Sequence, residues 1–174
     1  GQAAAKAAGL PEDDILLGKA SLFTSQEKFT DAAASYTDLI TRFPDSPRIA
    51  ESYLGRANAY YLSNDYPNAI NDYKQIISLY EMVPAQDKVV EKARFGLAWT
   101  YLKSGDLPGS IASFQSVVDK TDNRSVKVSA LTQIADAYQE TEQMDKAIEV
   151  YDKILKDMPD TPYSDHVQYR LGVA

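Results

Sequence analysis

The stretch from Ala57 to Ile76, ANAYYLSNDYPNAINDYKQI, contains a pattern that recurs along the chain. A small residue, Ala57, is followed by aromatic Tyr60 at +3, small Ala69 at +12, aromatic Tyr73 at +16 and aliphatic Ile76 at +19. The same offsets fit when counted from Ala20, Ala98 and Ala135, giving Phe23, Ala32, Tyr36 and Leu39; Tyr101, Ser110, Phe114 and Val117; and Tyr138, Ala147, Tyr151 and Ile154. Four matches over five columns indicate an internal repeat, which decides the fold before any single motif does.

The repeat predicts a pair of helices in each unit. Apolar residues recur at steps of three and four within each half, which is the helical period, and no segment alternates as a strand would. The predicted helices cover residues 11–24, 28–42, 47–62, 66–81, 86–103, 107–120, 125–140, 144–157 and 162–174. Short polar turns separate the halves: residues 25–27, 63–65, 104–106 and 141–143. Ser46 and Thr161 are predicted caps, with Pro47 and Pro162 at the first helical position. For the other two units the candidate caps are Asp87 and either Asn123 or Ser125.

This column pattern resembles the tetratricopeptide repeat (TPR) family over nearly the whole chain, from Pro11 to Ala174. The resemblance implies an all-α, right-handed alpha-alpha superhelix, or solenoid, with about four helix hairpins and the first helix of a fifth. Its small–aromatic series ends with Pro44 and Pro159 at +24, where Glu81 and Asp122 depart from the pattern. The predicted array has repeats at residues 11–46, 47–84, 85–123 and 124–160, a partial repeat at 161–174 and an N-terminal extension at 1–10.

The repeat spacing points to one branch of the family. The anchor alanines are 37, 41 and 37 residues apart, whereas the usual TPR period is about 34. The added residues fall between units, where Phe43-Pro44-Asp45-Ser46-Pro47 is echoed by Met158-Pro159-Asp160-Thr161-Pro162. Such junctions resemble the bacterial cell-envelope branch, which includes the periplasmic Tol–Pal coordinating protein and the outer-membrane assembly lipoprotein. The resemblance favours a periplasmic or outer-membrane-associated location over the cytoplasm, although a proline at a helix start also has a purely structural explanation.

Composition restricts the classes of function. The 174 residues carry a net charge of −7, which argues against binding to nucleic acid or to an anionic membrane surface. No apolar run is long enough to span a bilayer. Without cysteine there are no disulfides and no thiolate metal sites. The chain begins with Gly1 and ends within an amphipathic pattern at Leu171–Ala174, so we expect it to be part of a longer protein.

No motif indicates catalysis, a cofactor or a metal site. The acidic run Glu12-Asp13-Asp14 opens a predicted helix, where it complements the helix dipole. His166 is the only histidine, which is too few for a histidine-rich metal site. Glycines occur singly, so there is no phosphate-binding loop, and no nucleophile motif is present. We therefore expect a non-catalytic protein.

The resemblance implies that ligands bind on the concave surface formed by the first helix of each unit. Projected from the repeat register, the middle of that surface is apolar and aromatic, and the fourth unit is polar and acidic. The candidates for binding a peptide or helix are Leu54, Asn58, Tyr61, Phe95, Trp99 and Tyr169. Clustered aromatics are typical hot spots, and Asn58 is expected to bond the partner's backbone. The alternative is that these side chains pack on a neighbouring helix or on a segment outside this chain.

A chaperone-type carboxylate clamp is not expected, because only Lys92 fits among its register positions, which are Leu17, Ser21, Gly55, Lys92 and Gly96. The predicted function is a protein-interaction scaffold or adaptor. One alternative is a self-associating assembly module, in which the open end at Tyr169–Ala174 forms a homo-oligomer. Another is a regulatory domain of an enzyme whose catalytic part lies outside this chain.

Overall fold

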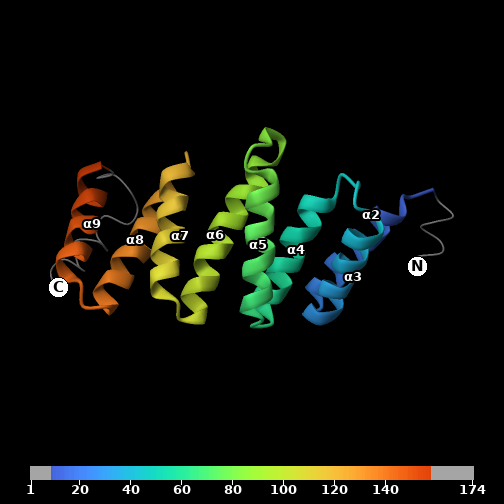
Figure 1. Ribbon diagram of the computed structural model, residues 1–174, viewed down its shortest axis with the longest axis horizontal. Coiled ribbons are helices and arrows are strands. Elements are labelled where there is room, and N and C mark those ends of the chain that lie inside the picture. The colour runs from blue at the N-terminus through green and yellow to red at the C-terminus, as the bar shows by residue number, and fades with distance from the viewer. Residues whose placement is uncertain (1–8, 158–174) are drawn as a thin grey trace. The chain divides into compact units, whose positions relative to one another are not determined.

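The computed structural model describes residues 9–157, which form helices and no strand (Figure 1). The helices are α2 (Glu12–Ser25), α3 (Phe29–Arg42), α4 (Ile49–Leu62), α5 (Tyr66–Tyr80), the short 3-10 helix η1 (Pro84–Gln86), α6 (Asp87–Ser104), α7 (Leu107–Lys120), α8 (Arg124–Glu140) and α9 (Met144–Asp157). Eight predicted helices are thereby confirmed to within two residues at each end. The ninth, at 162–174, lies outside the described residues, as do Thr161, Pro162 and His166. Within the described part, no helix is long and apolar enough to cross a membrane.

The chain divides into two compact units, and the boundary between Thr100 and Tyr101 lies inside α6. In the first unit, α3 packs against both α2 and α4, and α5 packs against α4 (Figure 1). In the second unit, α8 packs against both α7 and α9. Within each unit these helices therefore pack on their neighbours in sequence, as expected for stacked helix hairpins.

The repeat columns form the core of each hairpin. The anchor alanines are fully buried, and so are the small residues at +12 and the aliphatic residues at +19. Among the aromatics, the +16 column is buried (Tyr36, Tyr73, Phe114 and Tyr151), whereas the +3 column is only half-buried (Phe23, Tyr60, Tyr101 and Tyr138). Small residues allow the two helices to approach closely, and the +16 rings fill the space beside them.

Four turns share one unusual backbone conformation. The residue at +7 has a positive φ in every hairpin: 58° at Glu27, 65° at Asn64, 87° at Gly105 and 61° at Glu142. These residues lie in the predicted polar turns, each of which ends a first helix and redirects the chain into the second. Glycine adopts this region without penalty, whereas other residues pay about 1–2 kcal/mol.

This turn column predicts opposite effects at two equivalent positions. We expect Gly105→Ala to lower the free energy of unfolding by about 1 kcal/mol, because alanine is strained at positive φ. We expect Glu142→Gly to raise it by up to about 1 kcal/mol, because the strain there is relieved. Urea unfolding of both variants checks the pair. Equal signs for the two changes would contradict the assignment of this column.

The start of α4 differs from the sequence prediction. The helix begins at Ile49 rather than at Pro47, so the prediction of proline at the first helical position is wrong here. Pro47 lies instead in the turn before the helix. The Ser46 hydroxyl accepts a hydrogen bond from the Arg48 N–H and donates one to the Asp13 carboxylate. A contact with α2, which the local pattern does not encode, thus fixes the junction. Asn123 is the observed cap of α8, where its side chain accepts from the Val126 N–H at 3.1 Å.

The acidic run at the start of α2 also forms long-range contacts. Glu12 pairs with Arg42 at 2.5 Å, and Asp14 pairs with Arg48 at 3.0 Å. Arg42 ends α3 of the same hairpin, whereas Arg48 directly precedes α4, so the second pair joins α2 to the next repeat. They are solvent-exposed, and exposed pairs of this kind contribute little to stability. The two pairs connect the start of α2 to the end of α3 and the start of α4.

Candidate functional site

An aromatic pocket of about 340 Å³ lies between α4, α5 and α6 in the first unit. It is lined by Asn58 and Tyr61 from α4, Tyr73 from α5, and Gly96 and Trp99 from α6. Residues one helical turn apart face the same side of a helix, which is why Asn58 and Tyr61 on α4, and Gly96 and Trp99 on α6, line the pocket together. The pocket combines aromatic rings with one side-chain amide.

A glycine allows the tyrosine of the preceding hairpin to reach into this pocket. A Cβ atom at Gly96 would lie 2.6 Å from Cε1 of Tyr73, a distance that real side chains do not adopt. The ring of Tyr73 therefore lies directly on the backbone of α6. Its hydroxyl donates a hydrogen bond of 2.5 Å to Oδ1 of Asn58. Burial raises the pKa of Tyr73, so the hydroxyl keeps its proton and remains a donor at neutral pH.

Two edge-to-face ring pairs stiffen the walls of the pocket. Tyr61 contacts Tyr66 with ring centroids 6.1 Å apart, and Phe95 contacts Trp99 at the same distance. Desolvation also raises the pKa of Tyr61. Tyr61 and Trp99 are half-buried, so part of each ring is accessible to a ligand. Rings fixed by neighbours lose little conformational freedom on binding.

The structure brings together three of the six predicted groove residues. Asn58, Tyr61 and Trp99 line the aromatic pocket, and Phe95 contacts Trp99 from beside it. Leu54 is half-buried on α4 and does not line the pocket. Tyr169 lies outside the described residues.

The sequence prediction did not include Tyr73 or Gly96. Tyr73 belongs to the aromatic +16 column of the repeat, and Gly96 has no side chain to suggest a role. The repeat register nevertheless contained a signal. In the second hairpin the residue at +1, Asn58, is polar, and the residue at +16, Tyr73, is a tyrosine whose hydroxyl can reach it. The fourth hairpin repeats this pair, with the Tyr151 hydroxyl 2.8 Å from Oδ1 of Asp136.

An ion pair holds the helices of the first unit in place. The guanidinium of Arg56 on α4 donates two hydrogen bonds to the carboxylate of Asp72 on α5, at 2.8 and 2.7 Å. A third, of 3.0 Å, goes to the Thr37 hydroxyl on α3. The bonds to Asp72 raise the pKa of Arg56 further. Arg56 therefore connects three consecutive helices, two of which carry Asn58 and Tyr73.

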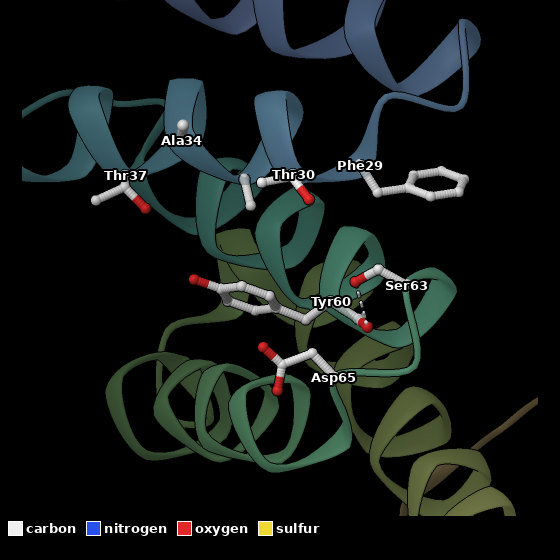
Figure 2. Close-up of a pocket in the computed structure, with 8 residues that line it drawn as sticks. Phe29, Thr30, Ala34, Thr37, Tyr60, Ser63 and Asp65 are labelled. Atoms are coloured by element: carbon white, nitrogen blue, oxygen red, sulfur yellow. Dashed lines mark hydrogen bonds between the residues drawn. The ribbon is translucent and has the colours of Figure 1, made fainter.

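A second cavity, of about 380 Å³, lies on the α3 side of the same unit and is lined by Phe29, Thr30, Ala33, Ala34, Thr37, Tyr60, Ser63 and Asp65. Figure 2 shows the ring of Tyr60 between the threonines of α3 and the carboxylate of Asp65. Two of its lining residues contact Arg56: the Thr37 hydroxyl accepts a hydrogen bond from the Arg56 guanidinium, which also lies 5.9 Å from the centre of the Tyr60 ring. This cavity thus adjoins the contacts of Arg56, and none of its lining residues has a side-chain amide comparable to that of Asn58.

Within residues 9–157, no group of three or more histidine, cysteine, aspartate or glutamate side chains is arranged to hold a metal ion.

Comparison with known proteins identifies a family. A family model described as an outer membrane lipoprotein, YfiO, matches residues 16–174. No curated protein matches the chain. Among solved structures, one crystal structure of MamA is 20% identical, covers 83% of this chain and 72% of its own, and has a TM-score of 0.65. A second crystal structure of MamA is 19% identical over 88% and 81%, with a TM-score of 0.69.

The fold is also similar to the TPR2AB domain of yeast Sti1, solved as a complex with pHSP90. That domain is 18% identical and covers 84% of this chain and 64% of its own length, with a TM-score of 0.62. At these identities the likeness concerns the fold, and it confirms the predicted all-helical TPR solenoid. This is the architecture of a protein-interaction scaffold, because stacked repeats present extended binding surfaces.

Proposed function

We propose that this chain, which belongs to the YfiO family of outer membrane lipoproteins, is a cell-envelope scaffold. It binds a segment of a partner protein in the aromatic pocket. The segment inserts an apolar side chain between Tyr61 and Trp99. A neighbouring backbone carbonyl of the segment accepts a hydrogen bond from Asn58. Catalysis has no part in this function.

The observation that carries the proposal is the orientation of Asn58. Its Oδ1 accepts the hydroxyl of Tyr73, so its Nδ2 is left as the donor, and Nδ2 makes no hydrogen bond within the described residues. Asn58 is exposed, whereas Tyr73 is 2% exposed. A fixed amide donor at the edge of an aromatic pocket suits a peptide, which offers one carbonyl per residue beside its side chains.

The substitution Asn58→Asp tests this orientation. Aspartate retains an acceptor for the Tyr73 hydroxyl but removes the amide donor. The fourth hairpin already has an aspartate at this column, Asp136, which accepts a hydrogen bond from Tyr151. We expect the affinity for a purified partner to fall at least about tenfold, because the partner's carbonyl loses its donor and faces a carboxylate. Isothermal titration calorimetry measures the change.

A matched control separates charge from position. Asn71 is exposed on α5 and is not among the pocket residues, so Asn71→Asp makes the same chemical change elsewhere in the unit. We expect this control to bind like the wild type. We expect Trp99→Ala to weaken binding by about 2 kcal/mol or more, as for an aromatic hot spot. Full affinity in both Asn58→Asp and Trp99→Ala, with the fold intact, would exclude the pocket.

A further inference from the structure

Among the described side chains that line it, the aromatic pocket offers a bound segment hydrogen-bond donors but no strong acceptor. Nδ2 of Asn58 is a donor, and the indole N–H of Trp99 can only donate. Oδ1 of Asn58 is the one amide oxygen in this lining, and it already accepts the hydroxyl of Tyr73 at 2.5 Å. The hydroxyls of Tyr61 and Tyr73 accept only weakly, because their lone pairs are partly delocalised into the rings.

The backbone of the pocket walls has its carbonyl groups bonded within helices. Asn58 and Tyr61 lie in the last turns of α4, and the Tyr61 carbonyl accepts a hydrogen bond from the N–H of Asn64. Gly96 lies in the middle of α6, and its carbonyl also accepts a hydrogen bond of 2.6 Å from the Thr100 hydroxyl. Such walls differ from the edge of a sheet, because they cannot pair with the backbone N–H groups of an extended segment.

These donors and acceptors distinguish three kinds of partner segment. In a helix the backbone carbonyls are bonded internally, so the Asn58 donor would meet no unbonded carbonyl. An extended segment of ordinary residues has free carbonyls, but each residue also brings an N–H that the pocket leaves unpaired, and a desolvated unpaired N–H is costly. A polyproline II segment has no internal hydrogen bonds, so its carbonyls are free, and its prolines have no N–H. The third kind matches the pocket.

The rings of the pocket suit the same kind of segment. Tyr61 and Trp99 are half-buried, and each is held by an edge-to-face neighbour, Tyr66 and Phe95, with 6.1 Å between ring centroids. Their accessible surfaces therefore keep fixed orientations. Grooves lined by aromatic rings bind proline-rich segments in several classes of protein, because the polyproline II helix is already formed and little of it must be ordered on binding.

We propose that the aromatic pocket selects a proline-rich segment in the polyproline II conformation. A proline ring lies between Tyr61 and Trp99, and an adjacent carbonyl of the segment accepts a hydrogen bond from Nδ2 of Asn58. This inference rests on the proposed function, because it names the class of segment that the same pocket binds. Tyr73 acts as a positioning residue: its hydroxyl engages Oδ1 of Asn58 and leaves the donor for the segment.

Three decapeptides, each labelled at its N-terminus, test the requirement for a missing N–H. The first is decaproline, the second alternates proline with alanine, which restores an N–H, and the third alternates proline with N-methylglycine, which lacks both the N–H and the ring. Polyproline II has three residues per turn, so an alternating peptide has no side made of proline alone. By fluorescence anisotropy with the 174-residue chain, we expect saturable binding of decaproline. We expect the alanine peptide to bind at least about tenfold more weakly, and the N-methylglycine peptide to bind between the two.

Variants of the chain test the positioning by Tyr73. Tyr73→Phe keeps the ring on Gly96 but releases Oδ1 of Asn58, so the pocket regains an acceptor. We expect the preference for decaproline over the alanine peptide to fall at least about threefold in this variant. Asn58→Asp should weaken the binding of decaproline at least about tenfold. Asn71→Asp, which makes the same chemical change outside the pocket, should leave it unchanged.

The outcomes separate this inference from the proposed function. Absence of saturable binding by decaproline, or equal affinity for the alanine peptide, would overturn the inference. It would also be overturned if the N-methylglycine peptide bound no better than the alanine peptide, or if Tyr73→Phe left the preference unchanged. The proposed function would still stand if a purified partner lost affinity in Asn58→Asp and Trp99→Ala. A partner that keeps full affinity in both variants would exclude the proposed function, whatever the peptides show.

Discussion

Replacing Asp72 with alanine is expected to lower the free energy of unfolding by about 3–5 kcal/mol. The side chains of Arg56 and Asp72 are only 16% and 7% exposed. The substitution removes both carboxylate acceptors and leaves the Arg56 guanidinium buried with one remaining hydrogen bond, to Thr37. Breaking one partner of a buried pair is costly because the other charge stays desolvated.

Urea unfolding measures this loss against two reference variants. Asp38→Ala removes one of the two carboxylate partners of Arg42, in an exposed pair where both side chains are 44% exposed, and we expect a loss below about 1 kcal/mol. Arg56→Met combined with Asp72→Leu removes both charges, and we expect it to recover most of the stability lost in Asp72→Ala. A loss in Asp72→Ala no larger than that in Asp38→Ala would contradict the role assigned to this ion pair.

A second pair of substitutions is expected to shift stability in opposite directions. Gly55→Ala places a Cβ atom 2.3 Å from the Tyr36 ring, so α3 and α4 must separate, and we expect a loss of about 1–3 kcal/mol. Gly18→Ala meets nothing within 4 Å. It should therefore gain the helix propensity of alanine, about 0.5–1 kcal/mol.

The ring itself supplies the control for this pair. Tyr36→Leu shortens the side chain that meets Gly55. Gly55→Ala should then be less harmful in the Tyr36→Leu background than in the wild type, since two residues in contact are not additive. The coupling is measured from the four unfolding curves of a double-mutant cycle. Additive effects, or a lower free energy of unfolding in Gly18→Ala, would argue against the close contact of Tyr36 with Gly55.

The helices were predictable because the repeat columns encode them four times over. The spacing of Ala57, Tyr60, Ala69 and Tyr73 fixes which sides of two helices face each other, and independent copies of the pattern agree. The turns were predictable for the same reason. The family model confirms the cell-envelope branch that the long junctions indicated.

The features that were not predicted depend on contacts between hairpins. Gly55 and Gly96 are each in contact with a tyrosine ring of the preceding hairpin, and that contact leaves no room for a Cβ atom. Arg56 and Asp72 belong to the second hairpin alone, since the equivalent positions of the other hairpins are Lys19 and Ser35, Leu97 and Ser113, and Ile134 and Val150. The repeat columns contain only what the units share, so an interaction present in one unit does not appear in them.

The candidate site was predicted in part for the same physical reason. Asn58, Tyr61 and Trp99 follow from the helix period, which places them on one side of their helices. The orientation of Asn58 does not follow from it, because that orientation depends on the hydroxyl of Tyr73 and on the missing side chain of Gly96. Position was thus encoded locally, and the hydrogen-bonding direction was set by a neighbouring helix.

The most direct test of the central claim uses the single tryptophan of the chain, Trp99, which lines the aromatic pocket. Incorporation of 5-fluorotryptophan gives one fluorine NMR signal at that position. We expect a purified partner to shift this signal saturably, with the same midpoint as calorimetry, and Asn58→Asp to weaken both responses equally. A partner that binds by calorimetry while the Trp99 signal stays unchanged would contradict binding in the pocket.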